Sequence, residues 1–469
     1  MEEKKTRAEE LKEALYMNRK NGGELLSAEE LKKCDDFCEG YKAFLDSAKT
    51  EREAVDTAIA LAEAKGFIPF DSEKKYEAGA KVYFNNRGKS LALAVIGTSP
   101  VENGVNISAA HIDSPRIDLK PNPLYESDEL ALFKTHYYGG IKKYQWTTIP
   151  LSLHGVFCKT DGTTVKVNIG EDEGDPKFVI TDLLPHLAQE QSKRSLSDGI
   201  RGEELNILIG SRPFRDGEEA DSVKLNIMNI LHEKYGIVEE DFMSAELECV
   251  PAAKACDIGF DRSMIGAYGH DDRVCAYPSI EAIFDIENPE VTAITILADK
   301  EETGSDGNTG MHSAWLKYFI YDLAKAQGGD IHKALANSRC LSADVNAAFD
   351  PTFSDVMEKR NASFLNYGAV ITKYTGARGK SGTSDASAEY VGKIRTILNN
   401  AGVIWQHGEL GKVDLGGGGT VAKYIANLGL DVVDLGVPVL SMHAPFEVVA
   451  KLDVYMTYRT VLEFFKAAK

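Results

Sequence analysis

The second half of the chain alternates strand-like and helical segments, and this alternation restricts the possible folds more than any other feature. From residue 251 on, apolar runs such as "VTAITILA" and "DVVDLGVPVL" are separated by segments with helical spacing, such as "TSDASAEYVGKIRTILNNAG". This order favours a mostly parallel sheet with helices on both faces. The sequence therefore predicts an α/β fold, in which ligands bind beyond the carboxyl ends of the strands.

The middle of the chain has a different pattern. Residues 120–250 carry short alternating apolar runs, turn signals such as "DGTT" and many aromatic residues, which predict a β-rich segment with a helix over "DLLPHLAQEQSK". The first ninety residues are predicted to be helical, and Ser27 followed by Glu30 forms a capping-box pattern. Two strands, "KSLALAVIGT" and "GVNISAAHIDSP", come next. We therefore predict an α/β domain of residues 1–119 and 251–469, interrupted by a β-rich domain of residues 120–250.

Composition narrows the class of protein. The 469 residues carry a formal net charge of −19, which argues against nucleic acid as a partner because phosphate binding needs clustered Lys and Arg. No stretch approaches the ~18 apolar residues of a membrane span, so no membrane partner is expected. The start, "MEEKKTRAEELKEALYMNRK", has neither the apolar core of a secretory signal nor the composition of a transit peptide. The seven scattered cysteines, without a C-x-x-C pair, predict reduced thiols in a cytoplasmic protein.

Histidine, aspartate or glutamate follows five of the apolar segments in the α/β part. In "SAAHIDSP", His111 and Asp113 are two positions apart and therefore on one face of a strand. The other residues of this kind are Asp271, Asp272, Glu301, Glu302, Asp344 and His443. Each has a simple alternative explanation: a structural histidine, a helix cap at the aspartate pair, or a charged turn at "DKEE".

Taken together, these residues suit a metal site. Carboxylates crowded at one edge repel one another unless a cation or shared protons compensate. Two imidazoles with three carboxylates suit a pair of divalent ions of the zinc type, with one carboxylate bridging. Neighbouring residues on an extended chain point to opposite faces, so Glu301 and Glu302 are expected to have different tasks. One would bind metal and the other would act as a general base.

The same segments resemble a known family. "AAHIDSPRIDLKPNP", "KEETGS", "SAD" and "LSMH", in this order, are similar to motifs of the M18 metallopeptidases, the aspartyl aminopeptidase family. "GKVDLGGGGT" and "MHAPFE" resemble its bacterial branch more than its eukaryotic one. The resemblance implies an enzyme that removes single residues from the free amino termini of peptides. It also implies that the insertion is a dimerisation domain and that the chain forms a homo-oligomer, a dodecamer built from dimers.

The resemblance assigns a role to each candidate residue. It implies two divalent ions per chain, zinc first, with manganese or cobalt as alternatives. One ion would bind His111 and Asp344, the other Glu302 and His443, with Asp271 rather than Asp272 as the bridge. Glu301 would be the general base, and Asp113 would orient His111 through its second ring nitrogen.

The sequence indicates the residues of the substrate pocket less clearly than the metal ligands. The family's substrate-binding lysine corresponds to Lys373, which stands one position later here, and on a strand that shift turns a side chain to the opposite face. Acidic substrates are therefore expected only if Lys373 or Arg378 reaches the pocket; otherwise neutral or apolar residues are preferred. Gly417 and Gly418, within the run Gly416 to Gly419, either offer N–H groups to an anion or form a tight turn before a helix predicted to open at Thr420.

Two other functions fit the same residues. A deacylase or carboxypeptidase could use this ligand set on different amides, and a shell-forming protein could carry it without activity. The complete ligand set argues against the second. An aminopeptidase, unlike a deacylase, should reject N-acetylated peptides. The chain contains neither the G-x-x-x-x-G-K-[ST] phosphate loop nor the G-x-S-x-G elbow of serine hydrolases.

Overall fold

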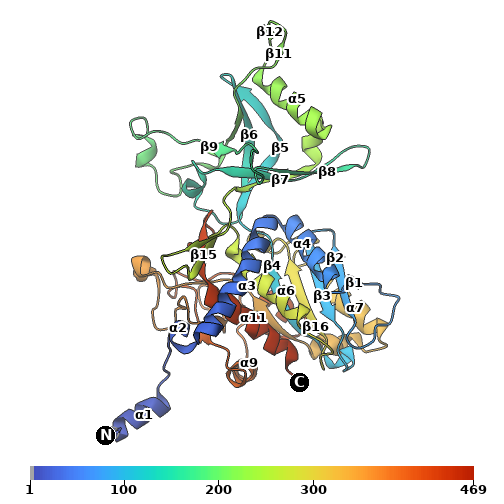
Figure 1. Ribbon diagram of the computed structural model, residues 1–469, viewed down its shortest axis with the longest axis vertical. Helices are drawn as coiled ribbons and strands as arrows, with labels where there is room; N and C mark the ends of the chain where they lie inside the picture. Colours follow the sequence, from blue (N-terminus) through green and yellow to red (C-terminus); the bar gives the residue numbers. More distant parts are fainter. Residues whose placement is uncertain (1–4, 469) are drawn as a thin grey trace.

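The computed structural model describes residues 5–468 and has two parts stacked along its longest axis (Figure 1). The lower part, called here the nine-stranded unit, contains residues 5–115 and 252–468 and is built on a nine-stranded sheet. The upper part, the seven-stranded unit, contains residues 116–251 and is built on a seven-stranded sheet. The chain passes into the upper part along β5 (Arg116–Ser127) and returns along β13 (Ala245–Pro251).

The nine-stranded sheet confirms the predicted α/β fold. Its order is β1 (Ile68–Pro69), β2 (Lys81–Asn86), β3 (Ser90–Val95), β16 (Ala293–Ala298), β4 (Asn106–His111), β17 (Arg339–Ala343), β21 (Asp431–Gly436), β19 (Ala369–Thr372), β20 (Trp405–His407). Five of its eight neighbouring pairs are parallel and three are antiparallel. Strands β3, β4, β16 and β17 are buried along their whole length, as expected for strands covered on both faces.

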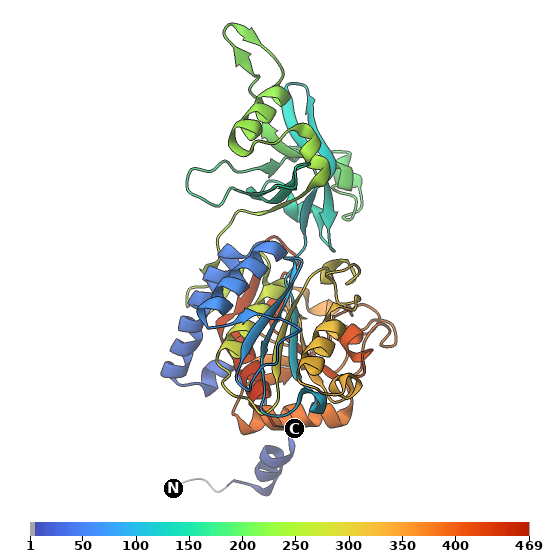
Figure 2. The same cartoon turned by 90° about the vertical axis from the view of Figure 1, so that its right-hand side faces the viewer.

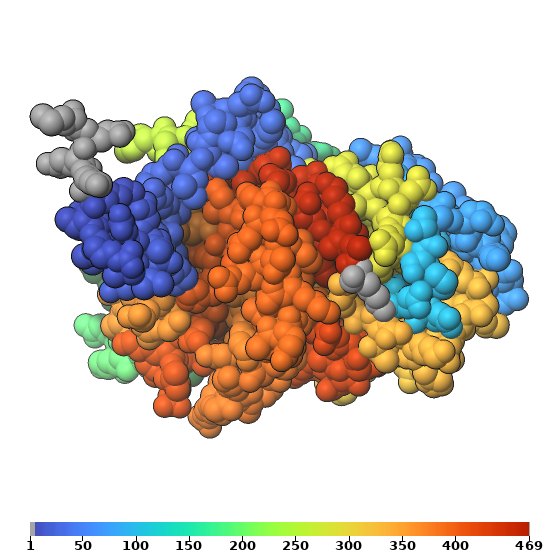
Figure 3. All heavy atoms as spheres, turned by 90° about the horizontal axis from the view of Figure 1, so that it is seen from below, coloured from blue at the N-terminus to red at the C-terminus, as the bar shows by residue number. Residues whose placement is uncertain are grey.

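Helices cover both faces of this sheet (Figure 2). Successive side chains of a strand point to opposite faces, so Leu91 and Leu93 join one core while Ala92 and Ala94 join the other. The first core is closed by α3 (Ala28–Ser47), α4 (Glu51–Ala64), α6 (His270–Phe284), α9 (Ala388–Asn400) and α11 (Lys451–Lys466). The second core is closed by α7 (Trp315–Ala326), α8 (Ile331–Ala336) and the five-residue α10 (Ala422–Ala426). Helix α11 packs against both α6 and α9, and its red atoms lie beside orange atoms of the α9 region on the face seen from below (Figure 3).

The N-terminal region is only partly as predicted. Ser27 caps α3: its hydroxyl accepts the N–H of Glu30, and the Glu30 carboxylate accepts the N–H of Ser27 at 2.8 Å. The short helices α1 (Arg7–Leu15) and α2 (Gly22–Leu25) precede α3, and α1 buries no residue. The prediction of helix up to residue ninety is wrong beyond Ala64, because "KVYFNN" pairs with β3 as strand β2. That pairing is a tertiary contact, which local spacing does not reveal.

A smaller sheet lies beside the central one. It has five strands in the order β14 (Cys256–Ile258), β15 (Met264–Ala267), β23 (Glu447–Ala450), β22 (Pro438–Leu440) and β18 (Asn346–Ala347). Only the β18–β22 pair is parallel. Within residues 5–468, no helix combines the length and apolar character needed to cross a membrane.

The seven-stranded sheet is antiparallel throughout. Its order is β8 (Thr164–Ile169), β7 (Leu151–Cys158), β13, β5, β6 (Leu130–Tyr138), β10 (Ile207–Gly210) and β9 (Val179–Ile180). A hairpin of β11 (Arg215–Asp216) and β12 (Glu219–Ala220) extends from it. One core fills this part, with Trp146, Phe157 and Phe242 among its buried side chains.

Two helix assignments in this unit differ from the sequence analysis. The helix predicted over "DLLPHLAQEQSK" is wrong, because only a 3₁₀ turn, Gln191–Lys193, forms there. Leu183, Leu184 and Leu187 remain exposed, so this segment has no apolar surface on which a helix could pack. The α-helix of the unit is instead α5 (Val223–Tyr235), which the sequence analysis does not include; Ser222 caps its first turn.

Candidate metal centre

The candidate metal ligands come from two different sheets. His111 ends β4, Glu301 and Glu302 follow β16, and Asp344 follows β17. These three strands are parallel neighbours in the central sheet, so their carboxyl ends meet at one edge. Asp271 instead follows β15 and His443 follows β22, both strands of the five-stranded sheet. The prediction that all five transitions lie on one sheet is therefore wrong, although the side chains converge.

Asp271 occupies the middle of the cluster. Its Oδ1 lies 3.1 Å from Nε2 of His111, and its Oδ2 lies 3.1 Å from Nε2 of His443. On the first side, Asp344 Oδ1 lies 3.6 Å from the same nitrogen of His111. On the second side, Glu302 Oε1 lies 3.5 Å from the same nitrogen of His443. Two histidine–carboxylate pairs thus stand on either side of one shared carboxylate.

The neighbouring Asp272 has a different environment. Its Oδ2 accepts the backbone N–H of His111 at 3.2 Å, and its side chain is completely buried. Asp272 also forms a group of close oxygen donors with Asp271 and Asp344. Among the described residues, no contact joins Asp272 to His443, whereas Asp271 touches both histidines. The geometry therefore favours Asp271 in the shared position.

The cluster is suited to holding cations. The cluster contains three groups of three residues, and within each group the donor atoms lie within 4.8 Å of one another. Together the groups contain His111, Asp271, Asp272, Glu301, Glu302 and Asp344. Burial, followed by the charge of Asp271, raises the pKa of Glu302 well above its ordinary value. The Oε1 of Glu302 is buried without a hydrogen-bond partner among the described residues. Divalent ions would compensate these crowded carboxylates, and a mixed set of imidazole and carboxylate ligands is typical of zinc.

Glu301 and Glu302 are not equivalent. The side chain of Glu302 is 4% exposed and that of Glu301 is 16% exposed, and both line a cavity of about 380 Å³. The Oε2 of Glu301 lies 4.0 Å from Nε2 of His111, further than the oxygens of Asp271 and Asp344. Burial, followed by the charge of Asp344, raises the pKa of Glu301 to about 8. Its longer distance from His111 and its greater exposure to the cavity suit a proton acceptor better than a metal ligand.

Asp113 connects several parts of the centre. Its Oδ1 lies 3.3 Å from Nδ1 of His111 and accepts the backbone N–H of Glu301 at 3.1 Å. Its Oδ2 accepts the backbone N–H of Glu302 at 3.2 Å and the hydroxyl of Tyr138 at 2.8 Å. The resemblance implies the contact with His111. The two contacts to the glutamate backbone are not evident from the sequence.

Three further contacts are also missed by the sequence analysis. Buried Glu447 accepts the backbone N–H of Asp271 at 3.1 Å and that of His443 at 2.8 Å. It lies within "MHAPFE", so the motif contains it without indicating its role. The carbonyl of Gly140, just after β6, accepts a hydrogen bond from Nδ1 of His443 at 2.8 Å. Tyr138 and Gly140 are far from the motifs along the chain, so no pattern could have identified them.

The glycine run packs closely against a neighbouring loop. Gly417 lines the cavity with a φ of +114°, and a Cβ there would lie 2.6 Å from the backbone of Ala377. The N–H of Gly418 donates to the carbonyl of Thr375 at 2.9 Å and is therefore occupied. These contacts favour the tight-turn explanation for Gly417 and Gly418. The helix predicted at Thr420 begins at Ala422.

The structure does not bring Lys373 to the cavity. Its Nζ lies 2.7 Å from Asp385 Oδ1, and its side chain lines a separate hollow beside Trp405 and His407. Arg378 lines a third hollow, formed by the loops at residues 374–380 and 409–417. Among the described residues, Lys423 is the cation that lines the 380 Å³ cavity. Val345, Leu410 and Met442 form apolar parts of its wall.

Histidine and carboxylate donors from two sheets that converge beside a cavity are typical of a metalloenzyme, and comparison with known proteins identifies the class. A family model described as "Aminopeptidase I zinc metalloprotease (M18)" matches residues 44–465. The chain belongs to this family and is a metallo-aminopeptidase. The resemblance seen in the motifs is thereby confirmed.

Individual relatives match over nearly the whole chain. A probable M18 family aminopeptidase 1 of Clostridium acetobutylicum is 52% identical over 446 residues, covering 93% of this chain and 96% of the relative. The crystal structure of an M18 aminopeptidase from Thermotoga maritima matches with a TM-score of 0.91 at 45% identity, covering 97% of this chain and 100% of that one. The structure of the S. cerevisiae mApe1 dodecamer shares the fold, with a TM-score of 0.75 at 20% identity over 93% of this chain and 97% of that one.

Proposed function

We propose that the protein is a two-metal aminopeptidase that removes single residues from the free amino termini of peptides. The observation that carries the proposal is the position of Asp271, 3.1 Å from His111 on one side and 3.1 Å from His443 on the other. Each histidine has its own carboxylate partner, Asp344 or Glu302. Asp271 would bridge two ions, and zinc fits these ligands best, with manganese or cobalt as alternatives.

The residues of the centre then have separate tasks. Bound ions would polarise the scissile carbonyl and make a nearby water more acidic. Glu301 takes a proton from the attacking water and delivers it to the departing amine. Asp113 fixes the ring of His111 and the backbone of both glutamates, so the distance between the base and the substrate stays constant. The 380 Å³ cavity is large enough for one amino-acid side chain and the first peptide bond.

Free-amine dependence tests this function against its rival. The purified protein, reconstituted with Zn, Mn or Co in turn, should hydrolyse Leu-terminal and Ala-terminal peptides and release one residue at a time. N-acetylated copies of the same peptides should remain intact. If the acetylated peptides were cleaved at comparable rates, the protein would be a deacylase or carboxypeptidase with the same ligands.

We also propose that neutral or apolar first residues are preferred. Moving a carboxylate out of water without a cation partner costs several kcal/mol. Lys373 is held by Asp385 outside the cavity, and the wall between the metal ligands includes Leu410 and Met442. Lys423 is the one described cation on that wall, so it sets how well an acidic side chain is tolerated.

Finally, we propose a homo-oligomer that assembles through the seven-stranded unit, whose segment 120–250 would be the dimerisation and lid domain. The unit exposes apolar side chains, among them Leu183, Leu187, Leu196, Ile230 and Met243. Where exposed apolar side chains gather on one face, they mark an association surface. The dodecamer formed by the S. cerevisiae relative supports the same assembly here. Mass measurement in solution, for the parent and for Leu187→Glu, tests the assembly.

We also propose a cytoplasmic location. The seven cysteines are free thiols, which supports it.

A further inference from the structure

The seven-stranded unit contributes a short segment to the metal centre, and the geometry points to a role for it. We propose that Tyr138, the last residue of β6, is a positioning residue that holds Asp113 and, through Asp113, the glutamate pair. This inference rests on the proposed function, because it concerns the placement of Glu301 as the base. Tyr138 does not belong to any of the motifs that identify the family.

The contact between the two units is direct. The hydroxyl of Tyr138 donates to Oδ2 of Asp113 at 2.8 Å, and Asp113 is completely buried. The same carboxylate accepts the backbone N–H groups of Glu301 and Glu302. A carboxylate with this many donors has a fixed orientation, and removing one donor leaves a buried oxygen short of a partner. The ring of Tyr138 therefore transmits the position of β6 to the turn that carries the base.

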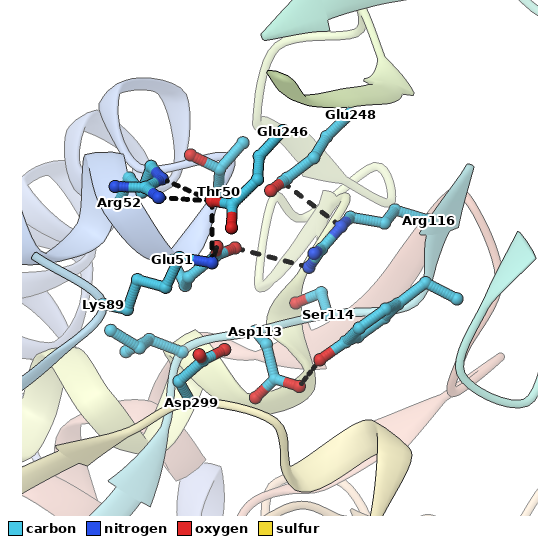
Figure 4. Close-up of polar contacts among 12 residues, drawn as sticks. Thr50, Glu51, Arg52, Lys89, Asp113, Ser114, Arg116, Glu246, Glu248 and Asp299 are labelled. Atoms are coloured by element: carbon cyan, nitrogen blue, oxygen red, sulfur yellow. Dashed lines mark hydrogen bonds and ion pairs between the residues drawn. The ribbon is translucent and has the colours of Figure 1, made fainter. Parts of the chain in front are cut away.

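Tyr138 is itself held from above. The guanidinium of Arg116 lies 3.9 Å from the centroid of the Tyr138 ring. Arg116 Nε lies 3.2 Å from Glu248 Oε2, and its Nη1 lies 3.4 Å from Glu51 Oε2. Figure 4 shows Arg116 paired with both carboxylates, with Asp113 below them.

The carboxylates around Arg116 belong to both units. The nearest is Asp118 on β5, whose Oδ1 accepts a hydrogen bond from Nε of Arg116 at 2.8 Å. Glu51 begins α4 in the nine-stranded unit, whereas Glu248 is on β13 in the seven-stranded unit. Lys89 also joins the two units, because its Nζ lies 3.8 Å from Glu51 Oε1 and 2.7 Å from Oε2 of Glu246 on β13 (Figure 4). Arg116, Glu51 and Glu248 are all buried. A buried ion cluster that loses one member leaves an uncompensated charge, so this cluster fixes one arrangement of the two units at the point where the chain crosses.

The residues that follow Tyr138 touch the other half of the centre. The carbonyl of Gly140 accepts from Nδ1 of His443 at 2.8 Å. Gly139 has a φ of +75°, and a Cβ there would lie 3.2 Å from Oε2 of Glu302. Residues 138–140 thus contact Asp113 and His443 within three positions, and a side chain at Gly139 would crowd Glu302. The seven-stranded unit therefore holds the geometry of the centre in addition to any role in assembly.

Tyr138→Phe tests the proposal, because it keeps the ring and its contact with Arg116 and removes only the hydroxyl. On a Leu-terminal peptide we expect kcat to fall about tenfold, the effect of losing one charge-assisted hydrogen bond. KM should stay within about twofold, because no group that binds substrate is lost. Metal content and thermal unfolding should match the parent. Tyr125→Phe is the matched control: Tyr125 is on β5 with Lys134 Nζ 5.1 Å from its ring centroid, and kcat should not change.

A double substitution separates positioning from general structural damage. If Tyr138 acts by placing Glu301, then Tyr138→Phe should cost little further activity in a Glu301→Gln protein. Arg116→Lys, which retains the charge but loses the planar stack, should give a smaller fall in kcat of the same kind. Parent-like kcat in Tyr138→Phe, equal losses in Tyr125→Phe, or additive losses with Glu301→Gln would each overturn the inference. A parent protein inactive on free-amine peptides would instead refute the proposed function.

Discussion

The two units differ in the direction of their strands and in how their sheets are buried. The nine-stranded unit has a mostly parallel sheet between two cores, and its central strands are buried on both faces. The seven-stranded unit has an antiparallel sheet over one core and keeps several leucines exposed. Every candidate metal ligand belongs to the first unit. The second unit places Tyr138 against Asp113, the residue beside the ligand His111, and places Gly140 against the ligand His443. The chemistry and the control of its geometry are therefore divided between units.

Removing a metal ligand tests this division with the largest expected effect. His111→Ala and His443→Ala should each lose bound metal and nearly all activity, because each histidine faces Asp271. His154→Ala is the matched control in the seven-stranded unit: this buried histidine also contacts carboxylates, Glu53 and Glu171. It should retain both ions. Metal analysis of the reconstituted proteins checks the result, and a parent with at most one ion per chain would contradict the two-metal centre.

Replacing each glutamate by glutamine in turn tests whether Glu301 and Glu302 have different roles in the centre. Glu301→Gln should keep both ions and lose on the order of 10²–10⁴ in kcat, the usual contribution of a positioned acid–base group. Glu302→Gln should lose metal first, because Glu302 is the more buried and lies beside His443. Kinetics and metal content on the same preparations distinguish the two. Exchanged phenotypes would mean that Glu302 is the base.

The sequence predicts the nine-stranded unit better than the seven-stranded unit, and the reason is physical. Buried parallel strands are uninterrupted apolar runs, so β4, β16 and β17 are visible without any partner. Half-exposed antiparallel strands and short helices depend on what packs against them. The helix over "DLLPHLAQEQSK" fails for this reason, whereas α5, which the sequence analysis does not include, packs on β5, β6 and β10 of the seven-stranded sheet.

The same distinction applies to the candidate site. The motifs contain the histidines and carboxylates because each directly follows an apolar run. Glu447 is visible as part of a motif, but its bonds to the backbone of Asp271 and His443 depend on the pairing of β15 with β23. Lys373 stands close to its expected position along the chain, yet Asp385 holds it outside the cavity. Contacts between distant segments cannot be obtained from local spacing.

Core truncation tests whether the two units are separate folding units. Phe157 packs against Phe242 in the seven-stranded core, and Phe319 packs against Phe70 and Phe84 in the nine-stranded unit. Each Phe→Ala change should cost about 3–5 kcal/mol of local stability. If the units unfold independently, calorimetry should show that Phe157→Ala lowers one transition and Phe319→Ala the other. A single transition lowered by both variants would mean that the buried ion cluster at Arg116 makes the chain unfold as one body.

The smallest effect is expected on substrate selectivity. The test compares substitutions of two lysines of the nine-stranded unit. Lys373 is paired with Asp385 outside the cavity, so Lys373→Met should leave kcat/KM unchanged for Asp-, Leu- and Ala-terminal peptides. Lys423 lines the cavity, so Lys423→Met should lower kcat/KM for the Asp peptide about tenfold relative to the Leu peptide, because an acidic side chain then lacks its only described cation. The parent should favour Leu over Asp. A strong preference for Asp that disappears in Lys373→Met would show that the loop carrying Lys373 closes over the substrate and that the family's lysine acts here after all.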